Sequence, residues 1–169
     1  LDKPGTISER LVKYKAERRE EATKNAAKTK PNEPGYASSG ACVNCHSGEF
    51  ARWALTGHAQ AWLSLVKRKE TNNPDCVGCH TTAYGEPGGL GELNASNIRK
   101  FKGVQCEMCH GPLSGHPSDA TVRARPIREK DCVVCHDEAN SPDFDFATYL
   151  AQASCQGGAP SIIPTPPDP

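Results

Sequence analysis

The sequence predicts a mainly helical fold with extensive loops and no significant sheet. Only 36% of its 169 residues are hydrophobic and 6% are aromatic, which is little for a core built from side chains alone. The 14 prolines and 15 glycines require much of the backbone to form turns or loops. Nine cysteines, a high number for this length, point to disulfides, metal ions or a bound cofactor as a further source of stability.

The first forty residues are predicted to form a charged helical arm and a linker. A helix is expected from Thr6 to Lys30, with Ser8 as its N-cap and an apolar stripe of Ile7, Leu11 and Tyr14. Residues 1–30 contain nine Lys/Arg and five Asp/Glu, so a basic arm precedes a mildly acidic body. We expect a solvated surface helix here, and a specific docking arm is the alternative. The linker is expected at 30–36.

The remaining elements follow from hydrophobic periodicity and from glycine and proline. The best helical pattern runs from Glu49 to Glu70, with His58 in its middle. A loop is expected at 85–91, a short terminal helix at 142–150, and an extended proline-rich tail from Gly157 onward. No segment predicts a strand. The chain is thus divided into the arm and linker at 1–40, a main domain at 41–155 and a tail at 156–169.

Eight of the nine cysteines form four pairs, and a histidine follows each pair directly. Zinc sites made of two C-x-x-C units and thioredoxin-like dithiols are the alternatives, but neither requires a histidine after every second cysteine. The pattern C-x-x-C-H is typical of covalent haem attachment. The motifs are Cys42-Val-Asn-Cys45-His46, Cys76-Val-Gly-Cys79-His80, Cys106-Glu-Met-Cys109-His110 and Cys132-Val-Val-Cys135-His136.

The spacing of this motif has a chemical reason. Two thiols three residues apart on a short helical turn can each bond to one vinyl group of the same haem, and the next residue offers its imidazole to the iron. The sequence therefore predicts four covalently attached c-type haems, each with its iron. The fold class becomes a multihaem cytochrome c in which the haems form much of the core. Cys155 belongs to none of the motifs, and we expect it to be a buried or free thiol or to form an intermolecular disulfide.

The attachment chemistry also predicts a location. Haem is attached to this motif outside the bacterial cytoplasm, so a periplasmic or extracellular, exported protein is expected. No apolar run is long enough to span a membrane, and a leader is expected to have been removed before Leu1. With zero net charge, no nucleic-acid partner is expected.

Axial ligands are in short supply. Two histidines on each of four irons would require eight, and the sequence has six. His58 and His116 are the candidates for distal ligands, so at most two haems can be bis-histidine. The other two are five-coordinate, bound by another side chain, or completed by another protein. Met108 lies inside its own motif and is a poor candidate, and His116 follows His110 too closely to reach the same iron.

The motifs and their flanking residues resemble the tetrahaem cytochrome c-554 family. The similarity extends over about Ala41 to Asp137. It lies in the order of the motifs and in the segments Trp53-Ala-Leu-Thr-Gly-His58-Ala-Gln-Ala, Gly88-Gly89 and Gly103-Val-Gln-Cys-Glu-Met-Cys-His-Gly-Pro112. The namesake of this family accepts electrons from hydroxylamine oxidoreductase in ammonia-oxidising bacteria.

The resemblance implies a mostly helical fold with closely spaced haem pairs. It also implies that His58 binds the third haem and His116 the fourth, and that the second haem lacks a distal side chain. In the family the first haem takes its distal histidine from a later segment, but no histidine follows His136 here. The first two haems are therefore expected to lack a distal histidine.

Three functions remain open. The leading hypothesis is an electron carrier or relay between redox partner proteins, an electron donor and an acceptor, without catalytic residues of its own. An enzyme that reduces or oxidises a small nitrogen oxide or a peroxide at a five-coordinate haem is the alternative. The third is an electron-transfer subunit of a larger cytochrome complex or filament.

Overall fold

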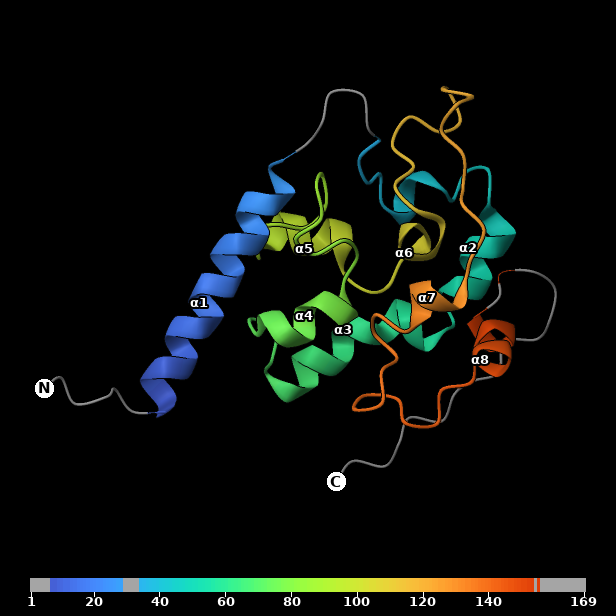
Figure 1. Ribbon diagram of the computed structural model, residues 1–169. Coiled ribbons are helices and arrows are strands. Elements are labelled where there is room, and N and C mark those ends of the chain that lie inside the picture. The colour runs from blue at the N-terminus through green and yellow to red at the C-terminus, as the bar shows by residue number, and fades with distance from the viewer. Residues whose placement is uncertain (1–6, 29–33, 154, 156–169) are drawn as a thin grey trace, which may run out of the picture.

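Helices and loops make up the part of the chain that the structure, a computed structural model, describes: residues 7–28, 34–153 and 155. Figure 1 shows a long helix, α1, beside a body of short helices joined by long loops. In these residues β-type pairing is limited to two isolated bridges, Thr81 with Lys102 and Tyr84 with Leu90. The predicted helical class without a sheet is confirmed. No helix in the described ranges is long and apolar enough to cross a membrane.

The predicted N-terminal helix is present as α1 (Ile7–Ala26). Ser8 lies inside it, so the prediction that Ser8 caps the helix is wrong, and Thr6 and Lys30 lie outside the described residues. Polar contacts join α1 to the segment before the second motif: the Tyr14 hydroxyl donates to Asp75 over 3.1 Å, and Arg19 donates to the carbonyl of Asn72 over 3.1 Å. All three residues of the expected apolar stripe, Ile7, Leu11 and Tyr14, remain exposed.

Glycines in the predicted loop at 85–91 let α1 approach closely. The Gly88 amide donates to the carbonyl of Ala26 over 2.9 Å. A Cβ atom placed on Gly91 would lie only 2.9 Å from the Cβ atom of Ala26, and one on Gly85 would lie 3.4 Å from that of Ala22. Small residues on both sides therefore hold this helix against the body.

The helix predicted over Glu49 to Glu70 is wrong as one element, because the structure divides it into α2 (Ser47–Trp53) and α3 (Gly57–Arg68). The Thr56 hydroxyl accepts a hydrogen bond from the Ala59 amide over 3.4 Å and caps α3. The break places His58 in the first turn of a new helix, facing a different direction from the one that a continuous helix would give it.

The other helices are short, and several contain motif residues. They are the 3₁₀ turn η1 (Ser39–Ala41), α4 (Pro74–His80), α5 (Ala95–Phe101), α6 (Cys106–His110), α7 (Glu129–Cys132) and α8 (Phe146–Ala153). The terminal helix begins later than predicted because the Asp145 carboxylate accepts a hydrogen bond from the Thr148 amide over 2.9 Å and so caps it. Residues 34–36 of the predicted linker have no helix, whereas residues 30–33 and the tail from Gly157 lie outside the described residues.

Side chains build only a small core. The buried cluster in the described residues consists of Leu65, Val77, Leu90 and Phe101, which come from α3, α4, the 85–91 loop and α5. Leu55, Leu63 and Val134 are instead more than half exposed, at 65%, 52% and 65%. Because this core is small, we expect the predicted prosthetic groups to contribute to the stability of the fold.

A buried polar cluster at the third motif joins three segments. The Glu107 side chain, only 1% exposed, accepts hydrogen bonds from the amides of Ala37, Ser38 and Leu113 over 2.8–2.9 Å. Gln105 accepts from the Ser39 amide over 2.7 Å and donates to the carbonyls of Lys100 and Lys102. The Glu107 carboxylate and the Gln105 side-chain amide therefore hold residues 37–39, which precede the first motif, against the third motif.

Replacing Glu107 tests this cluster. Glu107→Ala leaves three amides without their acceptor, so we expect the haem-loaded protein to lose about 3 kcal/mol or more of unfolding free energy. Glu107→Gln keeps one accepting oxygen and is expected to lose less. Denaturant titration measures both, with the exposed Glu138→Ala as control. An equal, small loss in all three variants would contradict the role of Glu107.

Replacing Gly91 tests the packing of α1 against the 85–91 loop. Gly91→Ala forces a methyl group against Ala26, so we expect a loss of about 1–3 kcal/mol and faster proteolysis within α1. Gly57→Ala is the control, because an added Cβ atom there has no neighbour within 4 Å. Equal thermal stability and proteolysis of the two variants would show that the close contact does not hold α1.

Candidate haem-binding sites

Each C-x-x-C-H motif forms a helical turn. In the first and fourth motifs the histidine amide donates to the carbonyl of the first cysteine over 2.9 Å, from His46 to Cys42 and from His136 to Cys132. The second motif ends α4 and the third forms α6. Pro74 at the start of α4 and the Asn73 cap favour that helix locally. All four pentapeptides thus have the local structure on which the predicted attachment depends.

The histidine of the first motif faces one of the two additional histidines. The ring centroids of His46 and His116 lie 6.5 Å apart, with 27° between their planes. Two imidazoles that bind one metal ion from opposite sides, with bonds of about 2 Å, have centroids about 6 Å apart. The distance between these two rings therefore matches a position for one metal ion between them.

A second pair has the same spacing. The ring centroids of His58 and His136 lie 6.0 Å apart, with 56° between the planes. Burial lowers the pKa of the His58 imidazole, and His136 lowers it further, while burial also lowers the pKa of His136. Both shifts favour the neutral form, which is the form that binds metals. Phe144 and Tyr149 lie against His136, each with a centroid distance of 5.2 Å, and shield this pair.

These pairs differ from the ones that the resemblance implied. His116 lies beside the first motif and His58 beside the fourth, so the expected assignments to the fourth and third haems are wrong. The reason is that the segment after the third motif folds back on the linker, where the Ser114 amide donates to the carbonyl of Gly35 over 2.9 Å. The expectation that the first motif lacks a second histidine is wrong for the same reason.

His80 and His110 have no facing imidazole. All six histidines lie among the described residues, and the other four are used in the two pairs. Met108 is turned elsewhere, because its sulfur atom accepts a hydrogen bond from the Ala83 amide over 3.1 Å. The second and third motifs therefore each offer one histidine to a metal.

The Nδ1 atoms of several histidines are held by oxygen atoms. His80 lies 2.8 Å from the carbonyl of Ala61 and 3.0 Å from the hydroxyl of Ser64. His136 lies 2.9 Å from the Ser141 hydroxyl, and His110 lies 3.4 Å from the carbonyl of Arg125. An Nδ1–H that donates to oxygen leaves Nε2 free to bind a metal and orients the ring.

Thiols of different motifs interact with one another. The Cys79 thiol interacts with Cys135, which lowers the pKa of Cys79 to about 7 and raises that of Cys135. Burial and the neighbouring Cys42 raise the pKa of Cys106 to about 12. Burial and then Cys132 raise that of Cys109 to about 11. The first and third motifs, the third and fourth, and the fourth and second therefore each have thiols close enough to influence one another.

Arg125 joins the third and fourth motifs. Its guanidinium forms a 2.7 Å ion pair with Asp131 in α7 and donates to the carbonyl of Met108 over 3.1 Å. Its backbone amide donates to the carbonyl of His110 over 2.9 Å. Gly111, which has a φ of +83°, leaves room for this side chain.

Sequence reasoning did not identify the residues that support the motifs. Three of these residues lie outside the motifs that they contact: Ser64, Ser141 and Arg125. Glu107 lies inside the third motif. The contacts of all four become visible only in the folded structure. A carboxylate inside a C-x-x-C-H loop is the one feature of the sequence that could have identified one of them, Glu107.

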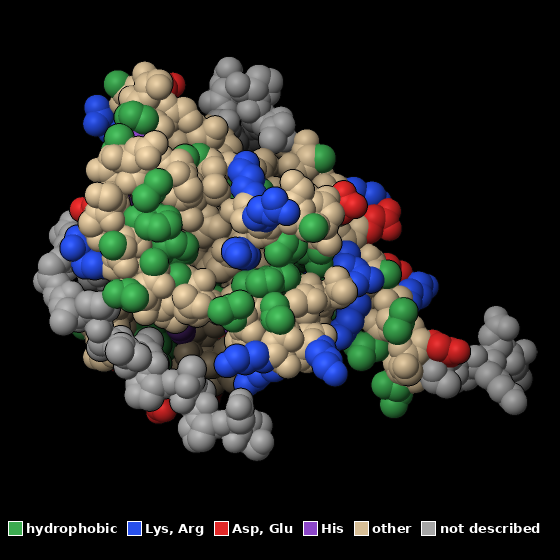
Figure 2. Space-filling view, turned by 180° about the vertical axis from the view of Figure 1, so that it is seen from behind, with side chains coloured by type: hydrophobic (Ala, Val, Ile, Leu, Met, Phe, Trp, Pro, Cys, Tyr) green, Lys and Arg blue, Asp and Glu red, His purple; other side chains and the backbone are tan. Residues whose placement is uncertain are grey.

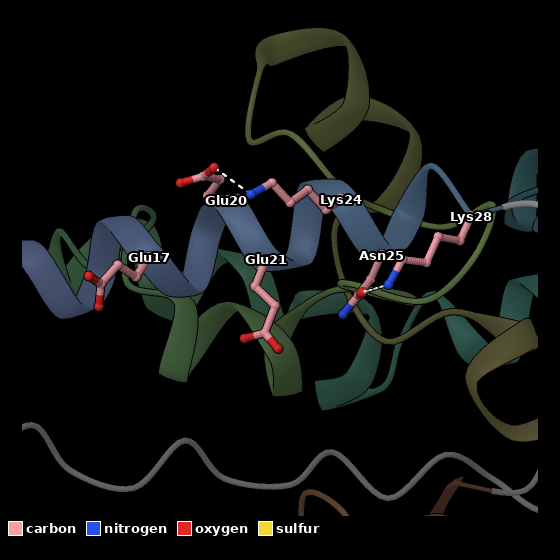
Figure 3. A pocket seen from close by; sticks show the side chains of 6 residues that line it. All are labelled: Glu17, Glu20, Glu21, Lys24, Asn25 and Lys28. Carbon is pink, nitrogen blue, oxygen red and sulfur yellow. Dashed lines mark hydrogen bonds and ion pairs between the residues drawn. The ribbon is translucent and has the colours of Figure 1, made fainter.

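A shallow groove on α1 offers no comparable chemistry. Its six lining side chains all come from the helix and its C-terminal end (Figure 3). Lys24 forms an ion pair with Glu20 at 2.6 Å, and Lys28 donates to Asn25 over 2.9 Å. This is a solvated helix face without a motif residue.

The arrangement fits covalently attached haem better than zinc. In the described part of the chain no group of three or more His, Cys, Asp or Glu side chains converges as a metal site. The histidine rings instead lie in two pairs, with centroids 6.5 and 6.0 Å apart, and each pair includes a histidine that directly follows a pair of free cysteines. A histidine directly after two cysteines is the arrangement of covalent haem attachment, and the second imidazole of each pair could supply the other ligand of the iron.

Comparisons with known proteins agree with this arrangement. The family model described as "Cytochrome c554 and c-prime" matches residues 41–111, which contain the first three motifs. Cytochrome c-554 of Nitrosomonas europaea is 36% identical over 86 residues, a match that covers 42% of this chain and 36% of that protein. The chain therefore matches about a third of the length of this relative. No solved structure matches.

The matched segment includes the first three C-x-x-C-H turns, His58, Gln105 and Glu107, and it ends just before the loop that carries His116. The fourth motif, at 132–136, follows the part that the family model covers. Residues 41–111 are therefore similar to the cytochrome c-554 family in motif order and in intervening sequence.

Proposed function

We propose that this protein is a tetrahaem c-type cytochrome that relays electrons between redox partner proteins. The two opposed histidine pairs, at 6.5 and 6.0 Å, are the observation that carries the proposal. Two imidazoles that held one haem iron between them would leave no position for a substrate, so such pairs suit electron transfer rather than substrate binding. When bound, the haems supply reversible one-electron chemistry at iron.

The contacts between motifs support a relay order. Cys42 interacts with Cys106, Cys109 with Cys132, and Cys79 with Cys135. Since each cysteine pair would hold its own haem, these interactions support the order first, third, fourth, second. The first motif, with His46 and His116, lies at one end of this order, and this end is the proposed site of exchange with a partner.

The surface suits transient partners. Figure 2 shows Lys and Arg side chains among apolar ones across the face seen from behind, with acidic groups mainly toward its edges. Mixed basic and apolar surface supports short-lived contact with an acidic redox protein, either a separate donor or acceptor or a larger multihaem complex. The attachment chemistry supports an exchange in the periplasm or outside the cell.

Mass and electron paramagnetic resonance (EPR) measurements test the proposal. We expect the purified protein to carry four haem additions and to have two low-spin haems per chain. His116→Ala and His58→Ala are each expected to convert one low-spin signal to high-spin, because each removes one axial ligand.

Met108→Leu is the matched control, because its sulfur already accepts a hydrogen bond from Ala83, and it should leave both low-spin signals unchanged. Fewer than four haem additions would refute the tetrahaem assignment. Unchanged low-spin signals in His116→Ala or His58→Ala would refute the corresponding pair.

A second function is favoured by one observation: His80 and His110 have no facing imidazole in a structure that describes every histidine. A metal held by one imidazole retains a position for a small ligand. Reduction or oxidation of a nitrogen oxide or a peroxide at the second or third motif is therefore the alternative function.

Measuring the turnover of small substrates distinguishes the electron relay from the enzyme. We expect the reduced protein to bind nitric oxide at the haems on His80 and His110 without consuming nitrite, hydroxylamine or hydrogen peroxide beyond one equivalent per haem. Optical spectra measure the binding, and analysis of the remaining substrate measures the consumption. Sustained consumption with an added electron donor would instead establish an enzyme.

A further inference from the structure

The histidine of the second motif has an unusual hydrogen-bonding environment. Its Nδ1 atom lies between two oxygen atoms of α3, at 2.8 Å from the Ala61 carbonyl and 3.0 Å from the Ser64 hydroxyl. The other motif histidines with an Nδ1 contact have one oxygen each: His136 at 2.9 Å and His110 at 3.4 Å. The four motifs share one sequence pattern, but their histidines are supported differently.

The protons at this site follow from the chemistry of the groups. A carbonyl oxygen can only accept, so the Nδ1 atom of His80 must carry the hydrogen that points at Ala61. The Ser64 hydroxyl donates its own proton to the same carbonyl over 2.7 Å, which leaves its lone pairs facing His80. The Nδ1–H group is therefore shared between two acceptors, and Nε2 has a free lone pair.

Packing holds these acceptors in place. Ala61 and Ser64 are three residues apart on one face of α3. The same helix supplies Leu65, which is 3% exposed and packs in the buried cluster with Val77 of α4, the helix that ends at His80. Because both helices are fixed by this core, the hydrogen bonds to His80 are preorganised.

We propose that Ser64 is a positioning residue that makes His80 a more strongly donating ligand and so stabilises the oxidised form of the second haem. The proposal rests on the proposed tetrahaem function. A hydrogen bond from Nδ1–H increases the electron density at Nε2, and a more basic imidazole favours ferric over ferrous iron. Of the motif histidines with an Nδ1 contact, His80 should then have the strongest effect of this kind and His110 the weakest.

Ser64→Ala tests the proposal directly. Alanine is the best helix former, and the Ala61 carbonyl remains, so the helix and the ring orientation are kept. We expect one haem to be reduced more readily, with an increase of about two- to tenfold in its ferrous-to-ferric ratio at a fixed applied potential. The other three haems should titrate as before in optical spectroelectrochemistry.

Matched variants identify the haem that changes. Ser64→Thr keeps a hydroxyl that can bond to the same carbonyl and should restore the original titration. Ser141→Ala removes the acceptor of His136 and should instead shift the haem whose low-spin signal disappears in His58→Ala. The iron–histidine stretching band of the haem on His80, measured by resonance Raman spectroscopy, should move to lower frequency in Ser64→Ala only.

The outcomes separate this proposal from the function on which it rests. An unchanged titration and Raman band in Ser64→Ala, with four haems attached, would overturn the role of Ser64 and leave the cytochrome function intact. A uniform shift of all four haems would also overturn it, because it would indicate a general structural effect. Absence of haem from the peptide that contains Cys76 and Cys79 in the unaltered protein would refute the tetrahaem function itself.

Discussion

Imidazole rings that face each other across the fold are the constraint on which the rest of the structure depends. His46 and His116 are distant in sequence, as are His58 and His136, yet their centroids lie 6.5 and 6.0 Å apart. One ring of each pair belongs to a covalent attachment motif, so a metal between the rings cross-links that motif to a remote segment. Folding and cofactor binding are coupled in such an arrangement.

The small side-chain core and the buried polar cluster follow from this constraint. The buried apolar cluster is confined to the packing of α3, α4, α5 and one loop, so it cannot position all four motifs. Specific polar contacts do so instead: Glu107 joins the start of the first motif to the third, and Arg125 joins the third to the fourth. Their geometry sets the distances between motifs, on which the proposed electron relay depends.

Identical motifs have different surroundings. His80 donates toward two oxygen atoms on a helix fixed by the core, whereas His110 has one more distant carbonyl in a loop. His136 is shielded by Phe144 and Tyr149, but His46 is exposed. One attachment motif can therefore offer a metal histidines of different ligand strength, which is how a protein differentiates otherwise identical cofactors.

The sequence by itself determined the helical class, the attachment chemistry and the shortage of axial histidines, because the C-x-x-C-H pattern and the histidine count are local or additive properties. It did not determine where α2 ends and α3 begins, because the Thr56 cap outweighs a continuous apolar pattern. Only the tertiary structure decided which histidines face each other and which oxygens hold them. Those pairings depend on contacts between distant segments, such as that of Ser114 with Gly35, which no local pattern encodes.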